Sequence, residues 1–305
     1  MNNIRKLRVE AFNNWPVEVK FPELDKYLKL LAKENIQVPM RHCELAFIED
    51  KDFHFYVAYL LDGLDSLPSR PDRAFESFYI PLEIEMKRLK ILTGNHSASR
   101  FSEYKNFLSN QPPPVIASLV KFIELAPLQI CEFAANRILN AKIGSDHTDT
   151  QLIKRGKDAL GADFFEAFCN KYSLATNSQV YDEKAKNQRK AGGLIRLVLR
   201  GEEVIIDGVK FEGNSIDRIG ILSTFILPSI RNDRFHGNVF PSFRSSKYKL
   251  KNFAGSQFAC TTSFLLVLLS IYSRWPTSVT PEIIQKTIDD NVFVFNKVFF
   301  SELRK

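Results

Sequence analysis

The sequence predicts a mostly α-helical protein with one small β-hairpin. Apolar residues recur at helical spacing through most of the chain, as in residues 22–33. The period changes at residues 204–211, where Asp207-Gly208 separates two short apolar runs and gives a strong hairpin signal. No repeat of fixed period is visible, so we do not expect a solenoid.

The expected helices follow from apolar spacing and from helix start and stop residues. Pro81 is expected to kink its helix, and Gly192 and Gly193 weaken theirs. Asn214 or Ser215 caps a largely apolar helix that Pro228 should bend, and Thr280 with Pro281 starts the last helix. The expected helical ranges are 22–33, 46–64, 75–92, 115–125, 128–141, 150–160, 163–172, 182–200, a helix from 215, 252–274, and a final helix ending near 302.

The clearest break in the chain is Asn110-Gln-Pro-Pro-Pro114, which favours an extended connector. We place a domain boundary there, because 305 residues suit two domains or one large helical domain with additions. Residues 1–110 then form a helical N-terminal region of unknown role. Residues 115–303 form a second helical domain, with its most informative part at 215–303.

Composition indicates a folded protein in a reducing compartment, which we take to be the cytoplasm. Four cysteines give neither a metal knuckle nor a disulfide framework, so buried reduced thiols are expected. The N-terminus has no apolar core of a secretory signal. Residues 258–272 are too short for a membrane span and predict a buried core helix, so no membrane partner is expected.

Positive charge is concentrated in one quarter of the chain. The net charge is +7, and residues 181–250 contain 13 Lys/Arg and 8 Asp/Glu, a net of +5. Such a surplus suits a polyanionic ligand, although a solvated basic surface without a ligand gives the same composition.

The segment most informative about chemistry is Ser229-Ile-Arg-Asn-Asp-Arg-Phe-His-Gly237, because it places many polar groups after an apolar helix. Asn232 and His236 are four residues apart and share one helix face, which the long side chain of Arg231 can also reach. Asp233 and Arg234 project elsewhere and are expected to form solvated or structural pairs. The alternative is an Arg and a His in a satisfied polar network at a helix end.

Arg231, Asn232, three further residues and His236 resemble the R-x4-6-H motif of the HEPN superfamily, as do Gly237 and the surrounding helices. The resemblance implies an HEPN-like helical bundle and a metal-independent endoribonuclease without a cofactor. It implies Arg231, Asn232 and His236 as catalytic residues, and a homodimer that completes the active site. It also implies a toxin or antiviral-defence effector with an antitoxin or regulatory partner.

The residue types fit RNA cleavage by the ribose 2′-OH. His236 is suited to transfer protons near neutral pH, and Arg231 can stabilise charge on the phosphoryl oxygens. Asn232 can orient His236 or donate to a phosphate oxygen. The alternative functions are a non-catalytic HEPN-like RNA-binding or scaffold protein and a nucleotide-handling enzyme, although the chain shows no nucleotidyltransferase signature.

Weaker candidates surround the motif. Basic and aromatic residues together can hold single-stranded RNA, but an ordinary surface loop explains them equally well. Asp146, His147 and Asp149 indicate a polar linker with a helix cap better than a metal site. The weak candidates for RNA binding are Arg234, Arg244, Lys247, Tyr248 and Lys249.

Overall fold

The computed structural model describes residues 2–17, 19, 21–95, 97–143, 150–176, 181–235 and 249–303. It confirms the predicted mostly α-helical fold with one two-stranded hairpin. The elements are α1 (Asn2–Asn13), α2 (Pro22–Lys33), α3 (Lys51–Asp65), α4 (Pro71–Thr93), α5 (Arg100–Ser109), α6 (Pro113–Ile123), α7 (Leu128–Ile143), α8 (Thr150–Leu160), α9 (Ala162–Thr176), α10 (Tyr181–Arg200), β1 (Ile205–Ile206), β2 (Val209–Lys210), α11 (Ser215–Gly220), the π-helix η2 (Ile221–Ile226), α12 (Leu227–Phe235), α13 (Leu250–Arg274) and α14 (Pro281–Leu303).

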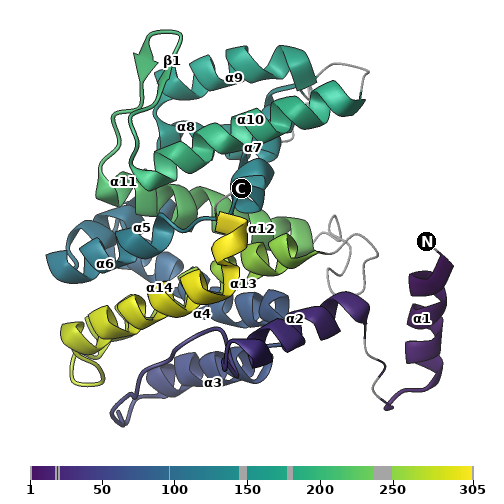
Figure 1. The fold of residues 1–305 in the computed structure, drawn as a ribbon. Helices are drawn as coiled ribbons and strands as arrows, with labels where there is room; N and C mark the ends of the chain where they lie inside the picture. The colour runs from purple at the N-terminus through teal and green to yellow at the C-terminus, as the bar shows by residue number, and fades with distance from the viewer. Residues whose placement is uncertain are drawn as a thin grey trace.

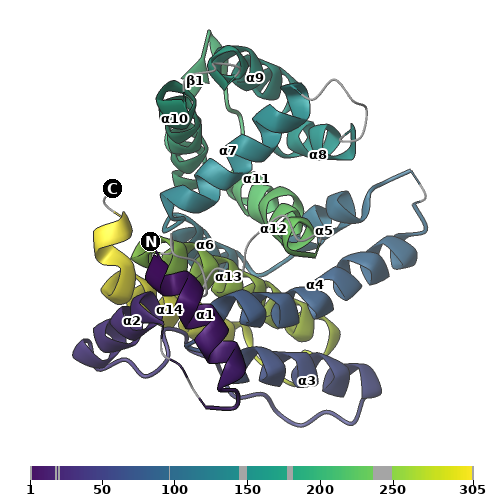
Figure 2. The ribbon, with the colours of Figure 1, turned by 90° about the vertical axis from the view of Figure 1, so that its right-hand side faces the viewer.

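The helices form two packed groups with α11, η2 and α12 between them (Figures 1 and 2). In one group, α13 packs against α4 and α14, and α3 packs on α4. In the other, α7 packs against α10, α9 and α8, and the hairpin lies beside α9. The segment formed by α11, η2 and α12 therefore has other helices on two sides. These neighbours determine which way its polar side chains point.

Helix α13 is the centre of the first group. It is long and apolar enough to span a membrane, but 94% of its most apolar window is buried inside the protein. The bent pair α6 and α7 passes the same length and composition test, with an angle of 87° between its two parts. Burial of α13 confirms the core helix expected at residues 258–272.

Residues on both sides of the proline-rich connector share one buried core. Tyr27 of α2 stacks on Phe253 of α13, with ring centroids 4.3 Å apart. Phe122 of α6 stacks on Phe258 of α13 at 5.3 Å. Aromatic packing thus ties the N-terminal helices to α13, so residues 1–110 help to build the surroundings of the C-terminal helices.

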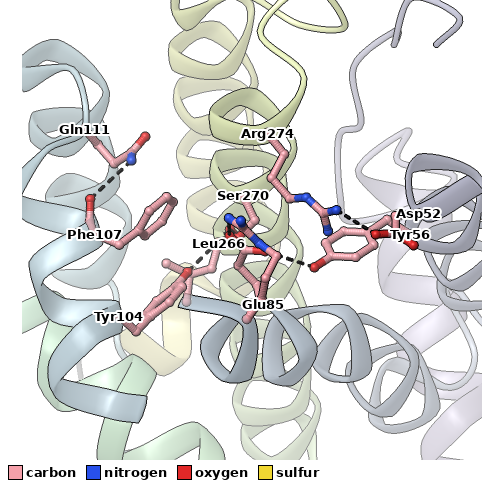
Figure 3. Close-up of polar contacts among 10 residues, drawn as sticks. Asp52, Tyr56, Glu85, Tyr104, Phe107, Gln111, Leu266, Ser270 and Arg274 are labelled. Atoms are coloured by element: carbon pink, nitrogen blue, oxygen red, sulfur yellow. Dashed lines mark hydrogen bonds and ion pairs between the residues drawn. The ribbon is translucent and has the colours of Figure 1, made fainter. Parts of the chain in front are cut away.

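A buried polar cluster joins α3 and α4, and Arg274 of α13 lies over the ring of its Tyr56 (Figure 3). Glu85 of α4 is fully buried, and Arg88 donates to both of its carboxylate oxygens at 2.6 and 2.8 Å. The Tyr56 hydroxyl donates to the same carboxylate at 3.1 Å. A buried charge needs such partners, so this cluster fixes the register of α3 on α4.

Several helices begin at other residues than expected, because a capping residue or a proline determines where each helix starts. Helix α3 begins at Lys51 rather than at residue 46, because the Asp50 carboxylate accepts hydrogen bonds from the N–H groups of Asp52 and Phe53. The expected connector is shorter, since Pro113 starts α6; proline at a first helical position loses no hydrogen bond. Helices α1 and α5 were not expected.

The motif helix contains a widened turn. Helices α11 and α12 are joined by η2, whose last N–H bond runs from Leu227 to the carbonyl of Leu222. Pro228 follows directly and has no N–H for a regular α-helical bond. The π-helical segment thus ends just before Pro228, where a bend was expected, and such segments are often found at functional sites.

Helices α7 and α10 approach closely at a glycine. A Cβ at Gly192 would lie 2.7 Å from the backbone of Glu132, whereas a Cβ at Gly193 would meet no atom within 4 Å. The two glycines that weaken the predicted helix thus have different roles, and only Gly192 is required by packing.

We expect Gly192→Ala to lower the free energy of unfolding by about 1–3 kcal/mol, because the helices must separate to admit a methyl group. Gly193→Ala is the matched control and should raise it by about 0.5–1 kcal/mol through helix propensity. Urea denaturation followed by circular dichroism measures both. Equal effects of the two substitutions would contradict the close contact.

Candidate nucleic-acid interface

Helix α4 carries a stripe of carboxylates toward the motif helix. Asp72, Glu76 and Glu83 are spaced by four and seven residues, which places them on one helix face. Tyr79 lies between them on the same face. We call Asp72, Glu76 and Glu83 the acidic stripe; each of its members pairs with an arginine of α12.

Arg234 is bound to the first two carboxylates of the acidic stripe. Its Nε donates to Glu76 at 2.8 Å, and its NH2 donates to Asp72 at 3.0 Å. Arg70 donates to both oxygens of Asp72 at 2.9 Å, so this carboxylate, which is 2% exposed, is fully paired. These contacts give Arg234 a structural role, as expected for a residue that projects away from the motif.

Arg231 lies at the other end of the acidic stripe. Its NH2 is 3.5 Å from Glu83, and its NH1 donates to the Oδ1 of Asn232 at 3.3 Å. Arg100, at the start of α5, donates to the same Glu83 at 2.9 Å. The Glu83 carboxylate therefore holds two guanidinium groups near each other, and both are about 31% exposed.

The opposite side of α12 is anchored as well. Asp233 is buried, and its carboxylate lies 3.5 Å from Arg137 of α7. Arg234 and Asp233 thus bind α12 to the two helix groups. Arg231 and Asn232, on the same turn, are both partly exposed.

Asn232 lines a cavity of about 390 Å³ with a strongly basic wall. The wall is formed by the end of α4, the start of α5 and one face of α8. Its charged residues are Lys90, Arg100, Lys154, Arg155 and Asp158. Four cations and one carboxylate leave a positive surplus beside the motif, which suits a phosphate-bearing ligand.

The hydroxyl of Tyr79 lies near the charged residues around Glu83 and the basic cavity. Burial raises the pKa of Tyr79, and the negative charge of Glu83 raises it further. The positive charges of Arg100, Arg231 and Arg155 act in the opposite direction. Three arginines from α5, α8 and α12 therefore lie close enough to influence one buried side chain, although they are far apart in sequence.

Some of the predicted site residues lie in the described part of the chain and others lie outside it. Arg231 and Asn232 are in contact, and Lys249 is exposed at the start of α13, where its N–H donates to Asn252 at 3.0 Å. Four candidates lie outside the described residues: His236, Arg244, Lys247 and Tyr248. Asp146, His147 and Asp149 also lie outside them.

The basic residues that line the cavity beside Asn232 were not among the candidates predicted from the sequence. Arg100-Phe101 and Lys154-Arg155 are ordinary pairs in the sequence, and only the tertiary fold brings α5 and α8 to the motif helix. The adjacent Arg100 and Phe101 show the same mixture of basic and aromatic residues as Arg244 to Lys249, and this mixture is the sequence signal that could have found them.

The cysteines and acidic residues give no metal site in the described part of the chain, where no group of three His, Cys, Asp or Glu side chains is placed to hold an ion. Cys131, Cys169 and Cys260 are buried, as expected, whereas Cys43 is half-buried. Burial raises the pKa of the Cys131 thiol to about 12, so this group is an inert core residue rather than a nucleophile.

Comparison with protein-family models, curated proteins and solved structures finds no match to this chain. The resemblance to the HEPN superfamily therefore stays a prediction made from the motif at residues 231–236.

Asp72 of the acidic stripe should make the free energy of unfolding depend on pH. Burial alone would raise the pKa of Asp72, but hydrogen bonds and charges from Arg70 and Arg234 outweigh it and hold the pKa below its ordinary value. A lowered folded-state pKa stabilises the protein above the pKa of the unfolded chain, which is about 3.9 for Asp. This contribution is lost as the pH falls through the folded-state value.

We expect Asp72→Asn to destabilise the protein at pH 7 by on the order of 2 kcal/mol, because charged hydrogen bonds are weakened. The difference from the wild type should shrink as the pH falls below about 4. Urea unfolding between pH 7 and pH 3 measures it, with the exposed Asp158→Asn as a control that shows no such difference. A difference that stays constant with pH would contradict the pairing.

Proposed function

We propose that the protein is a metal-independent endoribonuclease in which Arg231, Asn232 and His236 cleave RNA. The observation that supports it best is that Asn232, in contact with Arg231, lines a cavity whose wall carries Lys90, Arg100, Lys154 and Arg155. RNA is a polyanion, so a positive cavity beside the motif suits its backbone. By the resemblance, the protein would act in the cytoplasm as a toxin or antiviral-defence effector with a regulatory partner.

The proposed reaction is an internal transfer at one phosphate. The ribose 2′-oxygen forms a bond to phosphorus while the bond from phosphorus to the 5′-oxygen of the next nucleotide breaks. The 2′-hydroxyl proton leaves and the 5′-oxygen gains a proton, so charge and atoms balance. His236 is suited to this proton transfer, and Arg231 can stabilise the negative charge on the phosphoryl oxygens.

A non-catalytic RNA-binding protein is the second candidate, and one contact favours it. Glu83 lies 3.5 Å from Arg231 and 2.9 Å from Arg100, which partly neutralises both cations in the ligand-free protein. Such pairing is compatible with binding, because a phosphate can share a guanidinium group with a carboxylate. Catalysis additionally requires that Arg231 contacts the phosphate in the transition state.

Substitutions in the motif separate the two candidates. His236→Ala should remove proton transfer and Arg231→Ala should remove charge stabilisation, each lowering the cleavage rate by about 10²-fold or more. Asn232→Ala should have a smaller effect if Asn232 only orients its neighbours. Gel analysis of a labelled single-stranded RNA measures the rates, and thermal denaturation confirms folding. Undiminished cleavage by folded His236→Ala protein would contradict the mechanism, whereas RNA binding by the wild type without cleavage would favour the non-catalytic candidate.

The chemistry of the products tests the mechanism independently. Because Arg231 supplies positive charge at the phosphate, we expect cleavage to persist in EDTA. Attack by the 2′-OH should leave 2′,3′-cyclic phosphate and 5′-hydroxyl ends, and DNA should remain intact. Mass spectrometry of the fragments identifies the ends. An absolute need for Mg²⁺ would refute the mechanism.

One motif per chain leads us to expect a symmetric dimer in which two motif helices face each other. Light scattering at micromolar protein should give twice the chain mass of 35.0 kDa. Full cleavage activity by a monomer would exclude the composite site.

A further inference from the structure

Two cavities adjoin beside α8 and share one wall. The first, of about 390 Å³, reaches Lys90 and Asn232; the second, of about 350 Å³, reaches Lys105 of α5 and Thr224 of η2. We call the two together the α5–α8 groove. Their shared residues are Ser99, Phe101, Lys154, Arg155 and Asp158.

Two lysines of the groove have no ion-pair partner among the described residues. Lys90 and Lys154 form no ion pair with any residue in the described ranges, whereas Lys105 is paired with Asp217. Lys154 is exposed and Lys90 is half-buried at the groove wall. The groove therefore has positive charge available to an incoming anion.

The arginines of the groove are held in place before any ligand binds. The guanidinium groups of Arg100 and Arg155 lie 4.9 and 5.7 Å from the centre of the Phe101 ring. Arg155 also donates from Nε to the carbonyl of Gln151 at 3.3 Å. Side chains fixed in this way lose less entropy on binding, and their planar forks match phosphate oxygens.

We infer that the α5–α8 groove binds the backbone of single-stranded RNA and leads it to Arg231 and Asn232. The inference rests on the proposed function for the identity of the ligand. Asn232 lines the same cavity as Lys154 and Arg155, so a strand bound by these two residues lies beside the motif. Cations with an aromatic ring suit unpaired strands, because bases can stack on aromatic rings and on Arg planes.

The test uses full-length His236→Ala protein, so that the RNA stays intact, and a fluorescein-labelled oligouridine of about 20 nucleotides, longer than one binding site. Fluorescence anisotropy is measured over a series of salt concentrations. The groove variant is Lys154→Ala with Arg155→Ala. The matched control is Lys186→Ala with Lys190→Ala, which removes the same charge from exposed positions on α10 outside the groove.

The groove variant should bind about tenfold more weakly, and its slope of log affinity against log salt should be shallower by about 1.4, or roughly 0.7 for each lost phosphate contact. The control should change neither value by a comparable amount. Lys154→Gln alone, at an exposed position, should lower the slope by about half as much and keeps the test valid if the double variant unfolds. Unchanged affinity and slope in a folded groove variant would overturn the inference.

The outcomes distinguish failure of the groove inference from failure of the proposed nuclease function. RNA affinity that depends on Lys154 and Arg155, without cleavage by the wild type, supports the groove and refutes the nuclease. Cleavage by the wild type with affinity indifferent to both residues supports the nuclease and refutes the groove.

Discussion

The pairing of the α4 carboxylates with the arginines of α12 is the constraint on which the site depends. Asp72 is nearly fully buried, and its charge is tolerable because Arg70 and Arg234 surround it. Losing one partner would leave a buried charge, so α4 and α12 can hardly slide past each other. This fixed register places Arg231 at Glu83 and Asn232 at the basic cavity.

Local signals predicted most of the helices. Pro22–Lys33 was predicted with both ends correct, and Asp207 and Gly208 form the expected turn, with φ of 48° and 83°. Errors arose where one capping residue decides a boundary, as at Asp50. Helix α5 was missed because it has ten residues and a weak apolar pattern, so its packing rather than its own sequence determines it.

The site was predictable only in part. Arg231 and Asn232 are adjacent in the chain, so their contact follows from local geometry. Their surroundings do not: Glu83 on α4 pairs with Arg231, and Arg155 on α8 lines the same cavity as Asn232, yet both are far from the motif in the sequence. Long-range ion pairs depend on how the helices pack. The apolar and charged positions of a single sequence are compatible with many different packings. Arg234 illustrates this, because a structural pair was expected for it, but nothing near it in the sequence identifies Asp72 and Glu76 as the partners.

The most direct test of the account is a double-mutant cycle between Asp72 and Arg234. The free energy of unfolding is measured for the wild type, Asp72→Asn, Arg234→Gln and the double variant. If the acidic stripe positions α12, the two substitutions are not additive, and the coupling energy is about 1–3 kcal/mol, as for contacting residues in one network. Additive effects within about 0.5 kcal/mol would contradict the account, because α12 would then be held by other contacts.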